Sequence, residues 1–368
     1  MMSEYQYYEF QAIERPLTSE EQRAVSRLSS RVEPHPTRAV FVYNYSDFPG
    51  SAEKILAQYY DALFYITNWG SVQLAFRFPK TLLDEAAVTP YCVEDYVRYE
   101  AVGDYALLSF ERHDDTTGEW VEGEGMLAGL LPLREAILAG DYRALYLAWL
   151  LGVEEEALDD DDAEPPLPAG LGKLTGALQS FVDLFGVDAH LLAVAAEKSG
   201  AARNTAVSDL TRAIATLSAE EQGAWLLRLA QGETNLAQQF KRRLPLPRPE
   251  STQGDGRTVG DLREQAEARQ QAEAARRKVA AAAKHAQAME ALALQADDVW
   301  RWVTQLIEQK NARAYDEAVT QLGKLKQLAE YQGQTAVFQA RVDGLAAQYA
   351  RRPAFVERLQ KVKLGGGG

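Results

Sequence analysis

The sequence predicts an α+β protein: a small mixed or antiparallel sheet sandwich at the N-terminus, an all-helical middle and a long helical C-terminal arm. Two observations predict this class. Aromatic-rich, strand-like segments are confined to the first 115 residues, whereas only helix-like periodicity follows Glu122. An acidic segment with prolines, 154–169, separates the two kinds of sequence.

The first predicted strand is 5–13, which is rich in tyrosine and phenylalanine. A helix follows it, because Thr18 and Glu21 have the spacing of a capping box. Residues 39–45 are almost all apolar, so they predict a second strand with both faces buried.

Apolar residues recur at helical spacing over 52–66 and predict a helix there, ended by the turn 68–70. Alternating apolar residues predict a strand over 72–78, and 96–101 with 105–110 predict a closing hairpin. The order β-α-β-α-β-β favours helices on one face of a largely antiparallel sheet.

The rest of the chain reads as helices. Residues 126–152 predict two strongly apolar helices broken near Gly140, and 170–246 predict three or four short ones. A long alanine-rich helix is expected over 258–310, but its core positions are mostly alanine, which fits a leucine-type coiled coil poorly. Residues 315–349 then predict an antiparallel helical hairpin.

These patterns divide the chain into an N-terminal module, two linkers, a helical domain and a C-terminal helical part. The predicted boundaries are 1–153 for the α+β module, 154–169 for the acidic linker, 170–246 for the helical domain, 247–257 for the second linker, 258–364 for the long helix with the hairpin, and 365–368 for a glycine run typical of an artificial linker.

The charge is unevenly distributed. The net charge is −14, yet residues 251–368 carry 18 basic and 14 acidic side chains, whereas 1–150 carry 12 and 23. A single cysteine, Cys92, excludes an intramolecular disulfide framework. We expect a cytoplasmic protein, because no signal-peptide pattern is visible at the start and the longest apolar stretches are too short to span a bilayer.

No motif of a known catalytic or nucleotide site is present. The chain lacks the P-loop, dinucleotide-binding, zinc-protease and nucleophile-elbow patterns, and its four histidines are far apart. His113-Asp114-Asp115 resembles the pair used by metal phosphohydrolases, but it follows a predicted strand and is typical of a polar turn. We therefore expect no cofactor, no metal and no enzyme activity.

The run Asp159–Asp162 lacks the ligand spacing of a calcium loop, so a solvated linker is the preferred interpretation. One alternative stays open: this run lies against the basic third of its own chain or of a neighbouring subunit.

Three basic clusters are candidate nucleic-acid contacts, although cations at helix ends or on mixed-charge faces are a sufficient explanation. They are Lys241, Arg242, Arg243, Arg276, Arg277, Lys278, Arg351 and Arg352.

Aromatic side chains of the N-terminal module are candidate partner contacts on an exposed sheet face, although aromatics in strands are more often core. The candidates are Tyr5, Tyr7, Tyr43 and Trp69.

The segment 4–18, with Asn68-Trp69-Gly70 and 145–152, resembles a family of uncharacterised bacterial proteins over most of the chain. Residues 315–353 are similar to the helical tails of bacterial SWIM zinc-finger proteins, whose zinc-finger cysteines are absent here. The resemblance implies neither a metal site nor catalytic residues.

The sequence favours a non-enzymatic interaction or scaffold protein that binds one protein partner through the N-terminal module and another, or itself, through the C-terminal helices. One alternative is an accessory factor that contacts nucleic acid through the basic last third. Another is an enzyme with an unrecognised site in the N-terminal module.

Overall fold

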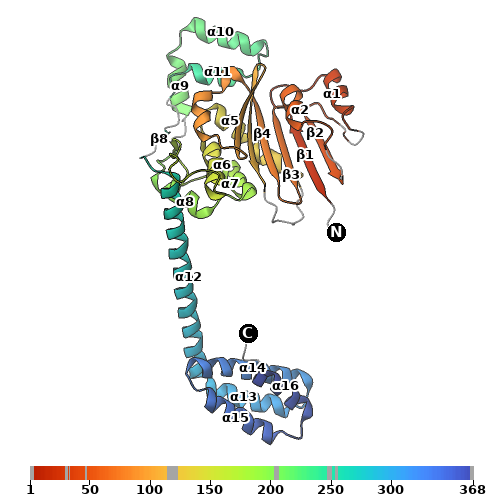
Figure 1. Cartoon of the computed structure of the whole chain (residues 1–368), viewed down its shortest axis with the longest axis vertical. Helices are drawn as coiled ribbons and strands as arrows, with labels where there is room; N and C mark the ends of the chain where they lie inside the picture. The colour runs from red at the N-terminus through yellow and green to blue at the C-terminus, as the bar shows by residue number, and fades with distance from the viewer. Residues whose placement is uncertain are drawn as a thin grey trace. The chain divides into compact units, whose positions relative to one another are not determined.

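The computed structural model describes residues 4–29, 32, 34–45, 48–113, 123–202, 207–246, 251–252 and 256–364. The chain forms two compact units, unit 1 (Met1–Gln270) and unit 2 (Gln271–Gly368). The boundary between them falls within helix α12 (Val259–Leu294). Figure 1 shows the labelled elements of both units.

Unit 1 contains a six-stranded sheet in the order β2-β1-β3-β4-β6-β5, and every neighbouring pair is antiparallel. The α+β class with an antiparallel N-terminal sheet is therefore confirmed. The strands are β1 (Tyr5–Gln11), β2 (Arg38–Asn44), β3 (Ala62–Thr67), β4 (Val72–Pro79), β5 (Val97–Val102) and β6 (Tyr105–Arg112).

Helices cover both faces of this sheet, so the expectation of helices on one face is wrong (Figure 1). The helices α1 (Ser19–Ser26) and α2 (Ala52–Tyr59) pack on one face, and helices from the second half of unit 1 pack on the other. The reason is visible in β1, where neighbouring residues Tyr7 and Tyr8 belong to opposite cores. Because successive side chains point to opposite faces, a strand that is apolar throughout needs two covers.

The predicted helix over 52–66 is wrong beyond Tyr59, because its second half is strand β3. Strand β3 lies between β1 and β4, and Leu63 and Phe64 are fully buried in opposite cores. A strand buried on both faces shows no alternation, so its apolar residues extend the helical pattern of α2. The spacing of apolar residues therefore does not reveal the boundary between α2 and β3.

Helices form most of the remainder of unit 1. They are η1 (Lys80–Leu82), α3 (Glu85–Val88), η2 (Thr89–Tyr91), α4 (Met126–Leu130), α5 (Pro132–Leu138), α6 (Arg143–Glu154), α7 (Gly176–Phe185), α8 (Ala189–Lys198), α9 (Val207–Ala215), α10 (Ala219–Ala230) and α11 (Leu236–Arg243). A short strand pair joins β7 (Leu167–Pro168) to β8 (Ser251–Thr252). Residues 143–153 of α6 are all buried, which fits their apolar sequence.

No single helix among the described residues has the length and apolarity needed to cross a bilayer. Helices α4–α5 taken together with α6 reach that criterion on length and composition alone, as a pair bent by 107°.

The segment 154–169, expected to be a solvated linker, packs against the start of α12 within unit 1. The Glu164 backbone N–H donates to the Arg257 carbonyl at 3.0 Å, and the Val259 N–H donates to the Asp162 carbonyl at 2.9 Å. Arg263 forms an ion pair with Asp160 at 2.6 Å. The alternative that this acidic run lies against the basic third of its own chain therefore agrees with the contacts.

Unit 2 is built around the helices that follow α12. They are α13 (Ala296–Glu308), α14 (Ala312–Tyr331), α15 (Thr335–Gln348) and α16 (Pro353–Leu364). The expected single helix over 258–310 is interrupted at Gln295, which separates α12 from α13. Side chains from these four helices and from the end of α12 share one core, with Val303, Leu322 and Val342 fully buried.

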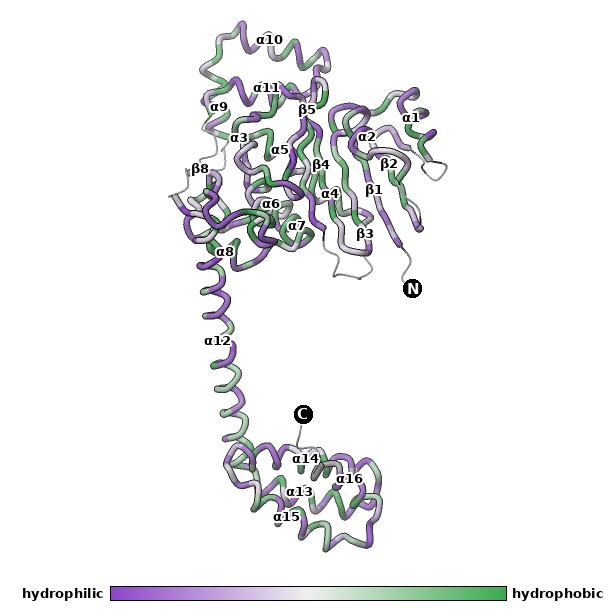
Figure 2. The backbone as a smooth tube through the Cα atoms, in the orientation of Figure 1, coloured by the Kyte–Doolittle hydropathy of each residue, from purple (hydrophilic) through white to green (hydrophobic). Residues whose placement is uncertain are grey.

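Helix α12 is exposed between its two ends, and every residue from 274 to 285 is exposed. Figure 2 shows this helix as alternating hydrophilic and weakly hydrophobic positions without a continuous apolar stripe. Alanine has the highest helix propensity, so the segment can remain helical with little tertiary packing.

Candidate functional site

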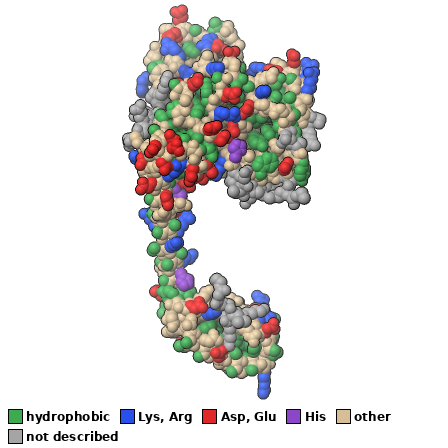
Figure 3. All heavy atoms as spheres, viewed as in Figure 1, with side chains coloured by type: hydrophobic (Ala, Val, Ile, Leu, Met, Phe, Trp, Pro, Cys, Tyr) green, Lys and Arg blue, Asp and Glu red, His purple; other side chains and the backbone are tan. Residues whose placement is uncertain are grey.

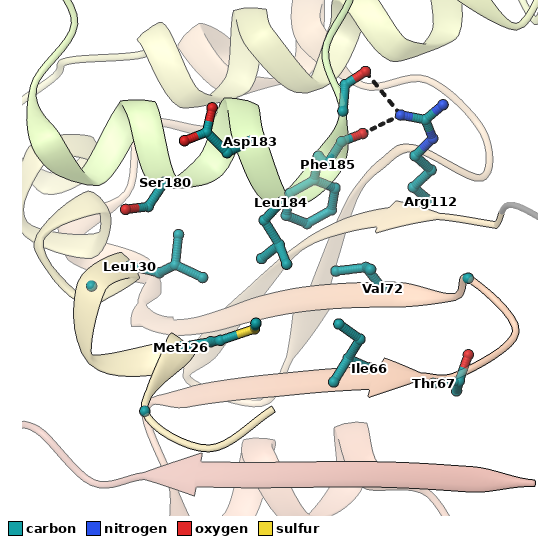
Figure 4. Close-up of a pocket in the computed structure, with 14 residues that line it drawn as sticks. Ile66, Thr67, Val72, Arg112, Met126, Leu130, Ser180, Asp183, Leu184 and Phe185 are labelled. Carbon is teal, nitrogen blue, oxygen red and sulfur yellow. Dashed lines mark hydrogen bonds between the residues drawn. The ribbon is translucent and has the colours of Figure 1, made fainter. Parts of the chain in front are cut away.

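A cavity of about 700 Å³ opens on unit 1 between the β3–β4 hairpin and helices α4 and α7 (Figure 4). Its lining is mainly apolar, with glycines at four positions. The lining residues are Ile66, Thr67, Gly70, Val72, Arg112, Gly125, Met126, Gly129, Leu130, Ser180, Asp183, Leu184, Phe185 and Gly186.

The hairpin supplies one wall of the cavity. Ile66 and Val72 are cross-strand partners, and both belong to the core on the α4–α7 face. The Thr67 backbone N–H donates to the Ser71 carbonyl at 3.0 Å and closes the turn. Gly70 has φ +102°, a conformation that favours glycine. The turn therefore holds both β-branched side chains at the cavity.

Helices α4 and α7 supply the other walls. Figure 4 shows Met126 and Leu130 from α4 and Leu184 from α7 around the same space. Gly129 also lines the cavity from α4, and a Cβ atom added there would meet only the Ser180 Oγ, at 3.7 Å. A small side chain at this position therefore leaves the cavity open.

Arg112 borders the cavity and binds the C-terminal end of α7. Its Nη1 donates to the carbonyls of Phe185 and Gly186, the latter at 2.9 Å, and its Nη2 donates to Glu155 at 3.3 Å (Figure 4). A cation at a helix C-terminus is stabilised by the exposed carbonyls. The Nε is buried and has no hydrogen-bond partner among the described residues. The guanidinium thus joins β6 to α7 through its terminal nitrogens.

The rim of the cavity carries two exposed polar side chains, Ser180 and Asp183, both on α7. The Asp183 Oδ1 accepts a hydrogen bond from Gln179 at 2.8 Å. Among the described lining residues there is no histidine, cysteine or lysine. The mainly apolar lining suits binding of an apolar group.

A second candidate site is the α10–α11 groove, a hollow of about 400 Å³ between these two helices. Helix α10 has no buried residue, and the exposed fractions of its leucines are 65% for Leu226, 59% for Leu227 and 63% for Leu229. The groove is lined by Ile214, Gln222, Trp225, Leu226, Leu229, Leu236, Ala237 and Phe240. Neighbouring exposed leucines of this kind mark interaction surfaces.

Aromatic and ionic contacts hold the two sides of the groove together. The ring centroids of Trp225 and Phe240 are 5.1 Å apart, and the Arg228 guanidinium lies 4.2 Å from the Trp225 ring centroid. At the other end, Arg243 pairs with Glu221 at 2.6 Å. These contacts hold the apolar faces of α10 and α11 in position within unit 1.

The first predicted basic cluster lies at the end of α11. Lys241 is exposed and has no ion pair within the described part of the chain. The Arg242 Nη1 donates to the Thr81 carbonyl at 2.7 Å, so the charge of Arg242 is not neutralised by that bond. Arg243 is ion-paired, as described above.

The other two basic clusters belong to unit 2. Arg276, Arg277 and Lys278 are exposed on α12, and Arg277 pairs with Glu273. Arg351 is exposed, whereas Arg352 pairs with Glu308 at 2.8 Å and donates to the Ile307 carbonyl.

The predicted aromatic contacts do not form one exposed surface. Tyr7 and Tyr43 are buried in the cores on opposite faces of the sheet, so the expectation is wrong for these two. Tyr5 and Trp69 are half-buried. Tyrosine can enter a core when its hydroxyl finds a partner, as Tyr7 does with Glu9 at 2.9 Å. Burial and the neighbouring acid raise the pKa of Tyr7.

The acidic junction is ion-paired in part and exposed in part. Figure 3 shows acidic side chains gathered on unit 1 next to the start of α12. Glu164, at the end of this segment, is buried with Arg257 and accepts a hydrogen bond from Tyr146. These contacts fold the junction onto its own unit. The Asp114 and Asp115 of the predicted His-Asp-Asp turn lie outside the described residues.

Sequence reasoning missed both candidate sites. The cavity residues come from segments more than 100 positions apart, and no local signal predicts their meeting. The groove had a weak signal, because Trp225-Leu226-Leu227-Arg228-Leu229 places apolar residues on too wide an arc for one buried helix face.

Within the described ranges, no group of three or more histidine, cysteine, aspartate or glutamate side chains has the arrangement of a metal site. No protein-family model matches the chain, and no curated protein or solved structure matches it.

Proposed function

We propose that this chain is a non-enzymatic interaction protein that binds an amphipathic, acidic helix of a partner protein in the α10–α11 groove. The observation that carries the proposal is the exposure of Leu226, Leu227 and Leu229 on a helix with no buried residue. Burial of one leucine contributes about 1.5–3 kcal/mol, so a partner that covers two or three gains substantial affinity.

The shape of the groove favours a helix as the occupant. Two packed helices with an apolar channel between them accept the apolar face of a third, with anchors at helical spacing. The channel contains the aromatic rings of Trp225 and Phe240, and aromatic residues are frequent at the centres of protein interfaces.

Charge favours an acidic partner. Lys241 and Arg242 follow Phe240 on α11 but line a neighbouring hollow with Leu138 and Tyr142, and neither is paired with a carboxylate in the described part of the chain. Glutamates of the partner would meet these cations across α11, beside the groove. Such contacts increase the association rate and depend on salt.

The test uses synthetic amphipathic helical peptides with leucines on one face and either glutamates or lysines beside them. Fluorescence anisotropy measures their affinity for the full chain. We expect the acidic peptide to bind, and the double variant Leu226→Ser with Leu229→Ser to weaken it at least tenfold, equivalent to about 1.4 kcal/mol. The matched control is Leu294→Ser, which alters an exposed leucine of unit 2.

Lys241→Glu should reverse the preference for the acidic peptide and remove part of its salt dependence. The proposal is abandoned if the double variant binds as tightly as the unmodified chain. It is equally abandoned if Leu294→Ser has the same effect as the double variant.

We also propose that unit 2 provides a second contact, to another protein or to a second copy of the chain. The supporting observation is the exposure of Trp302 and Val337, at 42% and 66%. Light scattering of the full chain and of Trp302→Ser with Val337→Ser tests self-association. If the full chain and the double variant are both monomeric at every concentration, the proposal that unit 2 binds a second copy of the chain is rejected.

The nucleic-acid alternative draws less support from the described contacts, because Arg243, Arg277 and Arg352 are already ion-paired. A salt-sensitive shift of DNA or RNA by the full chain, lost on Arg276→Gln with Lys278→Gln, would favour it. For the leading proposal we place the protein in the cytoplasm, as its single cysteine and acidic composition suggest.

A further inference from the structure

We propose that the cavity between the β3–β4 hairpin, α4 and α7 binds an uncharged, largely apolar small molecule that carries one hydroxyl or carbonyl group. This ligand site is separate from the α10–α11 groove. The two sites share none of their lining residues.

The size of the cavity fits a small molecule. Ligand sites usually enclose about 300–1,000 Å³, and this cavity has about 700 Å³. Ile66, Val72 and Leu130 form apolar walls from three different elements. These three side chains are almost fully buried, whereas Met126 and Leu184 are half-buried, and an apolar ligand would remove the exposed part of these two from water, which is favourable.

The charges around the cavity argue against a charged ligand. Arg112 is paired with Glu155 and its Nη1 donates to two carbonyls, so its charge is already balanced, and only its buried Nε has no hydrogen-bond partner among the described residues. Figure 4 shows Asp183 on α7 with its carboxylate pointing away from Ile66 and Val72, and its Oδ1 accepts a hydrogen bond from Gln179. Transfer of an unpaired charge into the apolar interior is costly.

One polar group is available for an uncharged ligand. Ser180 is exposed at the rim, and its hydroxyl has no hydrogen-bond partner among the described residues. A hydroxyl can donate or accept, so it can bind an alcohol or a carbonyl oxygen. The polar end of the ligand would therefore lie at the opening, next to Ser180, with its apolar part inside.

The experiment uses Nile red, an uncharged dye with a carbonyl group whose emission rises in apolar surroundings, and the full chain. Competitors are n-decanol, decanoate and decylammonium, which share one alkyl chain and differ in charge. We expect saturable Nile red binding and displacement by n-decanol at a concentration at least tenfold lower than by either ion. Equal displacement by decanoate or decylammonium overturns the proposed ligand class.

Variants locate the site. Gly129→Leu places a side chain in the cavity and should weaken Nile red binding at least tenfold. Gly129→Ala is the matched control, because its Cβ meets only the Ser180 Oγ at an ordinary contact distance and leaves the cavity open. If Gly129→Leu binds Nile red as the unmodified chain does, the cavity is not the site.

Two further variants keep the test decisive. Ser180→Phe covers the opening from an exposed position, where a large side chain needs no space in the core, and should also weaken binding. Leu226→Ser with Leu229→Ser alters only the α10–α11 groove and should leave Nile red binding unchanged. Loss of binding in that groove variant would assign the dye to the groove and overturn the inference.

Discussion

Arg257 and Glu164 form an ion pair at 2.6 Å, with 2% of each side chain exposed, between residues 93 positions apart. The pair joins the acidic junction to Arg257, two positions before the start of α12. Glu164 also accepts a hydrogen bond from Tyr146, and burial next to that acid raises the pKa of Tyr146. The junction and the start of α12 are therefore parts of one packed region of unit 1.

Removal of one member of this pair should destabilise unit 1. We expect Glu164→Gln to lower the free energy of unfolding by about 3–5 kcal/mol, because Arg257 would be left buried without a counter-ion. Urea denaturation measures the loss, and peptide-resolved hydrogen exchange assigns it to unit 1. Glu197→Gln is the control, since its pair with Arg269 is exposed and worth at most about 1 kcal/mol. Equal effects of the two variants would contradict this account.

The capping box of α1 should make stability depend on acidity. The bidentate bond from Arg15, together with the Thr18 N–H, lowers the pKa of Glu21 from 4.5 to about 2. A lowered folded-state pKa contributes stability above pH 4.5, and this contribution is lost as the pH falls through about 2. Glu21→Gln should therefore be less stable than the unmodified chain at neutral pH, and the difference should shrink toward pH 2.

Thermal or urea unfolding of both proteins across this pH range measures the difference. Glu20→Gln, one residue earlier on the same helix, is the control for general loss of negative charge at the helix start. A difference between Glu21→Gln and the unmodified chain that did not change with pH would show that the carboxylate is not responsible.

The left-handed residue that ends α7 should require glycine. Gly186 has φ +63°, and a Cβ there would lie 2.4 Å from the Arg112 Nη1. Gly186→Ala should cost at least about 1–2 kcal/mol, because the backbone is strained and Arg112 must move. Gly176→Ala, at the start of the same helix with nothing near its Cβ, should be neutral or stabilising by up to about 1 kcal/mol. Chemical denaturation of the two variants checks the contrast, which a similar loss in both would refute.

The exposed part of α12 should depend on alanine propensity alone. Ala281→Gly with Ala282→Gly should cost about 1 kcal/mol per residue in local helix stability. We expect faster hydrogen exchange over 274–285 and unchanged exchange in strands β1 to β6. Replacement of the same two residues by glutamine retains good helix formers and is the control. Altered hydrogen exchange in the sheet, or unchanged exchange over 274–285, would show that packing holds this segment in place.

Much of the sheet was predictable because its signals are local. The aromatic run over 5–13 and the apolar run over 39–45 correspond to β1 and β2, and alternation over 72–78 corresponds to β4. Thr18 and Glu21 form the predicted capping box. Such signals depend on neighbours within a few residues, which the chain itself supplies.

Strand β3 and the interruption at Gln295 were not predictable by the same means. β3 is apolar on both faces, so it could not be distinguished from the end of a helix. Around Gln295, apolar residues continue at helical spacing from Met289 to Trp300, and only the shared core of unit 2 requires the helix to turn there.

Local pattern accounts for the class of fold, the order of most elements and the alanine-rich helix, since each follows from propensity, spacing or capping. Tertiary packing alone decided that helices cover both faces of the sheet, that Glu164 meets Arg257, and that a cavity and a groove exist. These features depend on contacts between residues far apart in the chain. One sequence does not encode such contacts in any short-range pattern, because they arise only when buried surfaces meet.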